Sequence, residues 1–186
     1  MTALACAFAV GIGTAGAAPL TFETTLAPEV SGATGSGSAT LVIDTAANSL
    51  VLAVDWTGLS GLTTVAHIHC CVAASGTVAV AVTPGTLPGF PAGVQAGIYN
   101  NTFDTENPLI YTGGFVTNFG GGTIAGAEAA LLAGLLKGTA YFNIHSTLFG
   151  GGEIRGFFTA VPEPASLALL AAGLLGLLAT ARRRRV

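Results

Sequence analysis

The fold class follows from residues 49–56, which read SLVLAVDW and alternate between two kinds of side chain. Successive side chains of a β-strand point to opposite faces, so the two leucines, Val54 and Trp56 share one face and belong to a core. Similar short runs, separated by glycine and small polar residues, recur along the chain and predict an all-β sandwich or barrel. The expected strands are 20–26, 38–44, 49–56, 64–70, 77–83, 109–117, 139–146 and 153–160.

One short helix is expected among these strands, at residues 124–137. Its leucines form an apolar stripe, which predicts that the helix covers an open end or face of the β domain. Lys137 in the last turn and Gly138 just beyond it agree with the direction of the helix. Residues 84–108 contain four of the eight prolines. We expect long loops there, with at most one short helix or strand around 92–99.

Composition, charge and the lack of catalytic motifs exclude several classes of protein. The chain has 186 residues, of which 51% are hydrophobic and only 8% are charged, which excludes a disordered polyelectrolyte. Residues 18–161 keep two basic and eight acidic side chains, a net charge of about −6, so we expect no nucleic-acid partner. The serines and histidines show no triad pattern, and the glycine runs 120–122 and 150–152 lack the Lys-Ser/Thr of a phosphate loop. We therefore expect a protein that is not an enzyme.

Residues 1–17 are apolar and end on the small residues Ala15-Gly16-Ala17, as secretory signal peptides do, although a basic start is missing. The alternative is a buried N-terminal strand or helix, which three glycines in this segment disfavour.

The C-terminal segment, residues 161–186, has three parts. Pro162, Glu163 and Pro164 precede an uncharged stretch at 165–181, which is just long enough to be a hydrophobic transmembrane helix. A basic block follows, consisting of Arg182, Arg183, Arg184 and Arg185. Four arginines cannot cross a bilayer, so they stay in the cytoplasm and keep the preceding domain outside. The plain interpretation is a single-span anchor.

The same order of parts resembles the PEP-CTERM sorting signal of Gram-negative exopolysaccharide producers. That resemblance implies recognition by an exosortase at the inner membrane and cleavage near the Pro-Glu-Pro motif. The membrane anchor would then be transient, and the mature protein would reach the cell surface or the extracellular matrix.

All three histidines fall in expected strands. His67 and His69 share one face of their strand, and His145 shares a face with Tyr141 and Asn143 of another. Burying the opposite, apolar faces turns several polar side chains outward, where a single polar cluster is expected. Its members are His67, His69, Asn143, His145, Glu153 and Arg155.

Residues 66–69, 131–135 and 138–156 together resemble the CHRD domain of exported bacterial proteins, and the resemblance spans most of 20–160. Cys70-Cys71 replaces the glycine that often follows the His-x-His motif. The family implies an immunoglobulin-like or superoxide-dismutase-like Greek-key sandwich or barrel without an established activity, here occupying 18–160. We expect a binding or structural module that meets exopolysaccharide or a surface protein.

The alternative is a periplasmic or surface metalloprotein, redox-active in its extreme form. Neutral imidazoles at His67, His69 and His145 suit zinc or copper, with Glu153 or Cys71 as a fourth ligand. Against this stands a structural role, in which the histidines hydrogen-bond to backbone carbonyls or polar neighbours and fix the sandwich without a cofactor. Asp104 and its acidic and amide neighbours suggest calcium, but a solvated loop is the better interpretation.

Cys70 and Cys71 are adjacent, and Cα atoms joined by a trans peptide are about 3.8 Å apart, below the usual range of a disulfide. We therefore expect Cys70 to be a small buried residue. Cys71 is expected to be free, paired between molecules or near a metal.

Overall fold

The computed structural model describes residues 18–74 and 76–162, together with residues 173, 175, 177, 178 and 180. The expected signal peptide at 1–17, the motif residues Glu163 and Pro164, most of the stretch 165–181 and the arginines 182–185 lie outside the described residues. Within the part of the chain that is described, the helices are too short or too polar to span a bilayer.

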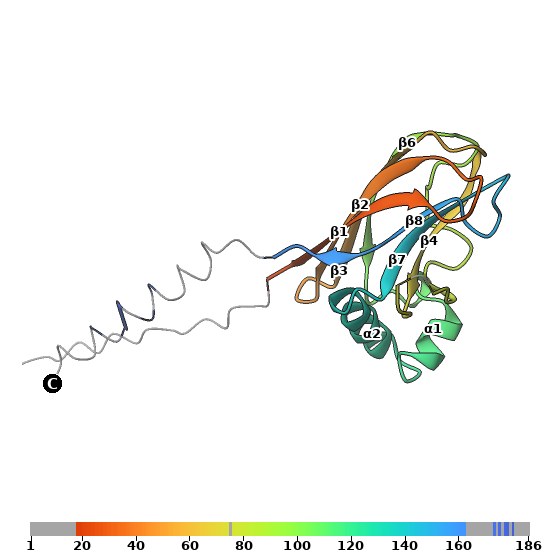
Figure 1. Cartoon of the computed structure of the whole chain (residues 1–186). Helices are drawn as coiled ribbons and strands as arrows, with labels where there is room; N and C mark the ends of the chain where they lie inside the picture. Colours follow the sequence, from red (N-terminus) through yellow and green to blue (C-terminus); the bar gives the residue numbers. More distant parts are fainter. Residues whose placement is uncertain are drawn as a thin grey trace, which may run out of the picture.

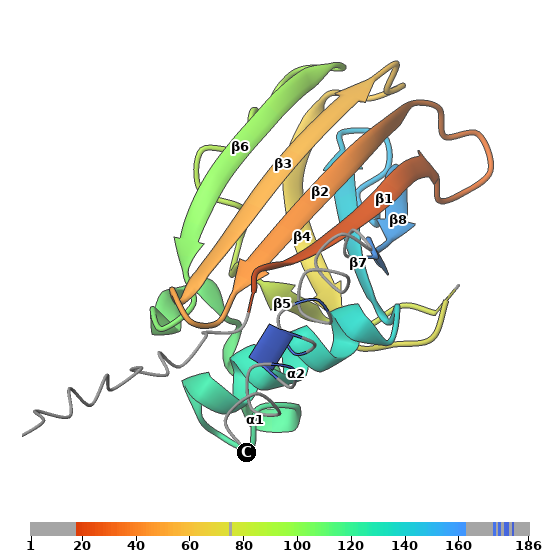
Figure 2. The same ribbon diagram turned by 90° about the vertical axis from the view of Figure 1, so that its left-hand side faces the viewer.

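The described chain is an all-β domain, as the alternating pattern predicts. Its strands are antiparallel and follow the order β5-β4-β7-β8-β1-β2-β3-β6, with β9 paired to β1. The bounds are β1 (Leu20–Pro28), β2 (Ser36–Asp44), β3 (Ser49–Thr57), β4 (Thr63–Cys70), β5 (Val80–Val82), β6 (Gly97–Asp104), β7 (Ala140–Ser146), β8 (Ile154–Phe157) and β9 (Thr159–Ala160). The sheet curls, so that β6, β3, β2 and β1 form one layer and β4 and β7 lie behind it (Figures 1 and 2). This curled sheet is compatible with a sandwich or barrel.

The core lies between the two layers and consists of the apolar faces that alternation predicts. Leu50 and Leu52 of β3 are fully buried, and Trp56 is 3% exposed, which confirms its place in the core. The Trp56 ring stacks on Phe90 with centroids 4.9 Å apart. From the other layer, Phe142 and Ile144 of β7 are fully buried against this cluster.

Helical elements close one end of the curled sheet (Figures 1 and 2). They are the 3-10 turn η1 (Pro108–Ile110), α1 (Gly113–Asn118) and α2 (Ile124–Leu136). The hydroxyl of Thr123 accepts a hydrogen bond from the Gly126 N–H and so caps the start of α2. Gly138, with a φ of 66°, follows the last turn in the left-handed conformation that favours glycine. The expected helix is therefore confirmed, and Leu131 is among the residues that it buries.

Two expectations for the chain between β5 and α2 are wrong. Residues 109–117 form no strand but η1 and α1, because the Thr112 hydroxyl accepts from the Phe115 N–H and starts a helix. The expected loop at 84–108 contains the complete strand β6. This strand forms because β3 offers a continuous partner from Ser49 to Trp56, against which Tyr99 and Phe103 turn inward.

Two further expected strands are shorter than the pattern suggests. The expected strand 77–83 keeps only the three residues of β5, and 153–160 divides into β8 and β9. The division has a structural use, because β8 continues the layer of β7 while β9 pairs with β1 at Phe22 and Glu23.

Cys70 is fully buried, as expected, but the three states considered for Cys71 are wrong, because Cys71 forms a disulfide with Cys70. Their peptide bond is cis and their Cα atoms lie 3.0 Å apart, whereas the expectation assumed a trans peptide. Both sulfurs lie against Gly134 of α2, where a Cβ atom would overlap with them. A side chain at this position is therefore excluded by the disulfide.

Candidate functional site

The three histidines lie together on neighbouring strands, β4 and β7. In the register of this pair, His67 lies opposite Asn143 and His69 lies opposite Tyr141. Between the histidines of β4, Ile68 points into the core and is fully buried. The histidine face is covered as well, since His67 is 7% and His69 is 8% exposed, while His145 is half-buried.

Each imidazole is held by a backbone carbonyl. His67 Nε2 lies 2.9 Å from the Gly85 oxygen, His69 Nδ1 2.7 Å from the Val78 oxygen, and His145 Nδ1 2.9 Å from the Gly150 oxygen. A carbonyl oxygen only accepts, so each of these nitrogens carries the hydrogen. In a neutral imidazole the other nitrogen is then a bare acceptor.

The three bare acceptors face one another. One ring nitrogen from each histidine lies within 4.8 Å of the other two. His67 Nδ1 and His145 Nε2 are 3.4 Å apart, and His69 Nε2 is buried without a hydrogen-bond partner. The sequence predicts which faces the side chains occupy, and the strand pairing adds that these faces meet.

Burial keeps the two histidines of β4, His67 and His69, neutral. It lowers the pKa of His67, and a positive charge on neighbouring His145 would lower it further. Burial likewise lowers the pKa of His69 to about 4, with the charges of the other histidines and Arg155 acting in the same direction. The hydrogen bonds to Gly85 and Val78 oppose these shifts without cancelling them. At pH 7 the two strand β4 histidines therefore present lone pairs, not charges.

A partly buried ion pair lies beside the histidines. Arg155 Nη1 of β8 is 3.1 Å from Glu29 Oε1, and the same nitrogen donates to the Gly76 oxygen at 3.0 Å. The guanidinium lies over the Tyr141 ring at 5.2 Å, and Tyr141 in turn stacks on His69 at 4.6 Å. These contacts connect the ion pair to the histidine cluster through one aromatic ring.

Asn143 forms a second connection. Its amide nitrogen donates to Glu29, and its amide oxygen is buried without a partner. The structure thus places Asn143 and Arg155 near the histidines, as the face pattern predicts. Glu29 was missed, because it lies more than 100 residues from both partners and no local pattern in the sequence joins them.

Two residues considered as a fourth metal ligand lie elsewhere. The carboxylate of Glu153 is fully buried and accepts from the backbone N–H groups of Ser60 and Gly61, so it holds a turn and is not part of the polar cluster. Cys71 is bonded to Cys70 and lies against α2. Asp104, considered for calcium, accepts from the Glu106 N–H within its own turn.

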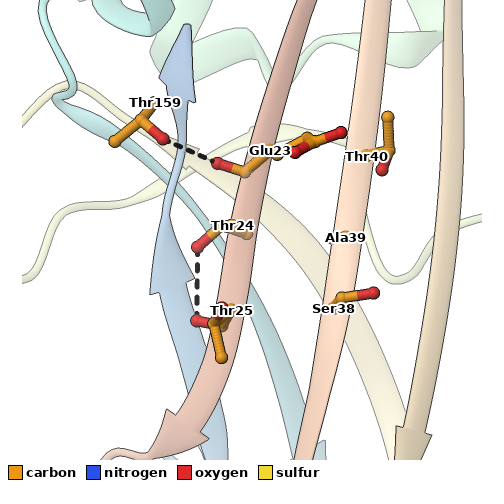
Figure 3. A pocket seen from close by; sticks show the side chains of 7 residues that line it. All are labelled: Glu23, Thr24, Thr25, Ser38, Ala39, Thr40 and Thr159. Carbon is orange, nitrogen blue, oxygen red and sulfur yellow. Dashed lines mark hydrogen bonds between the residues drawn. The ribbon is translucent and has the colours of Figure 1, made fainter. Parts of the chain in front are cut away.

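A second surface of interest is the outward face of β1, β2, β3 and β6. We define its outer polar face as Glu23, Thr25, Ser38, Thr40, Asp55 and Asn100, which lie on neighbouring strands. Two shallow hollows lie on this surface. The first is lined mainly by hydroxyl side chains, and at its margin the Thr159 hydroxyl donates to the Glu23 carbonyl (Figure 3). The second is lined by polar side chains together with Val54, Ile98 and Tyr99, and within the described residues neither hollow contains a metal-ligating cluster.

Comparisons with known proteins confirm both resemblances noted in the sequence. A family model described as the CHRD domain matches residues 17–158, about three quarters of the chain. A second model, described as a PEP-CTERM protein-sorting motif, matches residues 160–185. Neither a curated protein nor a solved structure gives a significant match.

Proposed function

We propose that this chain, which belongs to the CHRD domain family, acts as a non-enzymatic binding or structural module at the cell surface or in extracellular polysaccharide. The PEP-CTERM motif indicates export and membrane-anchored sorting, and it implies recognition by an exosortase. The observation that carries the proposal is the immediate succession of a complete β domain and this motif.

The end of the domain supports a role as a tethered module. The last strand, β9, pairs with β1, and the Val161 N–H then donates to the Thr21 carbonyl at 2.8 Å. The sorting motif begins at residue 160, directly at this point. Of the described residues in the matched segment, only Ala160 and Val161 contribute to the sheet, so a deletion that begins at Pro162 removes no described strand.

The outer polar face supports contact with a hydroxyl-rich polymer or a surface protein. Its side chains are short and combine hydroxyl, amide and carboxylate groups, which donate and accept hydrogen bonds without a large entropic cost of ordering. Asp55 accepts from the Ser38 hydroxyl at 2.6 Å, so part of this surface is already held in place. The net negative charge of the domain disfavours anionic lipid and nucleic acid as partners.

Deletion of residues 162–185 tests the sorting step. The truncated protein should appear in the medium, whereas the full chain should be recovered with the cell envelope or surface. Replacement of the four terminal arginines by lysines serves as the control, because it keeps the charge of the cytoplasmic block. Unchanged surface retention of the truncated protein contradicts the sorting role.

Thr40→Arg tests the outer polar face, because it places a long charged side chain between the two hollows. Ala46→Arg, in the exposed turn between β2 and β3, is the matched control. Co-sedimentation with exopolysaccharide isolated from the host, and capture of surface proteins, should fail for the first variant and persist for the second. Equal retention of both variants contradicts this face as the contact surface.

A further inference from the structure

We propose that His67, His69 and His145 form a mononuclear site for a borderline transition-metal ion, copper or zinc, with one ring nitrogen of each histidine as a ligand. The proposal is independent of the sorting and surface role, because neither requires a metal. Three observations support it, namely the carbonyl contacts that fix the imidazole hydrogens, the distances between the acceptor nitrogens and the chemistry of the surroundings.

The positions of the hydrogens leave an unsatisfied centre. The carbonyls of Gly85, Val78 and Gly150 fix one N–H on each ring, so no hydrogen remains for the inner nitrogens of neutral histidines. Buried polar atoms nearly always have a hydrogen-bond partner, yet His69 Nε2 has none. The other two inner nitrogens, His67 Nδ1 and His145 Nε2, are two acceptors that face each other. A single cation at the centre satisfies all three lone pairs at once.

The distances agree with metal coordination. Bonds from zinc to imidazole nitrogen are about 2.0–2.1 Å long, so two ligand nitrogens of a tetrahedral site lie about 3.3–3.4 Å apart. The observed separation of His67 Nδ1 and His145 Nε2 is 3.4 Å. The third nitrogen lies within 4.8 Å of the others, so it must move closer to them before all three can bind one ion.

The surroundings already have the form of an outer shell. Histidines that bind metal commonly donate their second N–H to a backbone carbonyl or a carboxylate, which fixes the tautomer and the ring orientation. All three histidines do so here, toward carbonyls at three separate points of the covering loops. The positive charge of Arg155 is paired with Glu29, which reduces its repulsion of a bound cation.

The ligand set selects the class of ion. Among the described residues, the group contains three imidazoles and neither carboxylate nor thiol, which suits copper and zinc and does not suit calcium or magnesium. Three protein ligands leave a fourth position for water or a small exogenous ligand. The amide oxygen of Asn143, opposite His67 on the neighbouring strand, is likewise buried without a partner.

The test uses the full chain, purified in detergent, stripped with a chelator and titrated separately with Cu²⁺ and Zn²⁺. We expect one equivalent of ion to bind, and nitrogen hyperfine structure of the copper form should report three imidazoles. The chain contains only three histidines, so this signal has a single source. His145→Gln changes the half-buried ligand and should weaken binding more than about 100-fold, beyond the loss usual for an outer-shell partner. Glu106→Gln, on an exposed turn, should bind as the wild type does.

Equal affinity of the wild type and His145→Gln for both ions overturns the proposal, and so does a stoichiometry well above one that the variant leaves unchanged. A second measurement requires no variant. Long-range ¹H–¹⁵N spectra of the metal-free wild type should show hydrogen on Nε2 of His67 and on Nδ1 of the other two histidines. A hydrogen on His67 Nδ1 would remove the unsatisfied centre and overturn the proposal as well. Either failure leaves the sorting experiment unaffected.

Discussion

Replacement of Glu153 by glutamine separates the two roles considered for this residue. In the structure its carboxylate is fully buried and accepts hydrogen bonds from the N–H groups of Ser60 and Gly61. A glutamine side chain is nearly isosteric, but it has only one acceptor oxygen, and its NH₂ group would face an N–H donor. The variant therefore loses one hydrogen bond to a charged group and leaves buried donors unsatisfied.

The expected cost follows from these two losses. A hydrogen bond to a charged group contributes about 1.5–3 kcal/mol, and an unsatisfied buried donor costs about 1–3 kcal/mol. The two overlap in part, so we expect Glu153→Gln to lower the free energy of unfolding by about 2–5 kcal/mol. Urea denaturation followed by tryptophan fluorescence measures this change, since Trp56 is the only tryptophan and lies in the core.

Glu106→Gln is the control, because this side chain is exposed and should change stability by less than about 0.5 kcal/mol. Copper and zinc affinity of folded Glu153→Gln should equal that of the wild type. Two results would refute the reasoning. Unchanged stability would show that the carboxylate does not hold the turn, and a large loss of metal affinity would restore Glu153 as a ligand.

Three further predictions concern packing, backbone conformation and protonation. Leu131→Ala should destabilise the fold by about 2–5 kcal/mol because Leu131 is fully buried, whereas Leu136→Ala, at 56% exposure, should have little effect; equal urea midpoints contradict the placement of α2. Gly138→Ala should cost about 1–2 kcal/mol, since φ is 66° there, and an unchanged thermal midpoint contradicts this. Burial lowers the pKa of His67, and that of His69 to about 4, from 6.5, so the unfolded chain binds more protons and the unfolding free energy of metal-free protein should fall as pH falls from 6.5 toward 4; a flat profile contradicts burial.

Alternation predicts the strands whose two faces differ strongly, and for these the agreement is close. The pattern of β3 places its leucines and Trp56 correctly because one face is buried and the other is not. Strand β6 lacks such a contrast, since Asn101 occupies an inward-type position between Tyr99 and Phe103, and its pairing with β3 compensates. Apolar residues at 109–117 predict a strand, but Thr112 caps the N-terminus of α1 and the segment forms a helix instead.

For the candidate site, period two predicts that His67 and His69 share a face and that His145 faces as Asn143 does. It does not predict that β4 and β7 are neighbours, because the chain between them includes β5, β6 and two helices. The alternating pattern also does not predict that Glu153 lies apart from the histidine cluster. Glu153 precedes β8, and its side chain is held by the turn at Ser60.

The pairing of β9 with β1 has a mechanical consequence. Force applied through a C-terminal tether reaches Val161 first and then the two-residue ladder at Phe22 and Glu23. So short a ladder yields bond by bond, while β1 remains attached to β2 through seven residue pairs. When the tether is pulled, detachment of β9 lengthens the linker to the domain by a few residues, each about 3.3 Å long when extended. This happens before the force acts on the core.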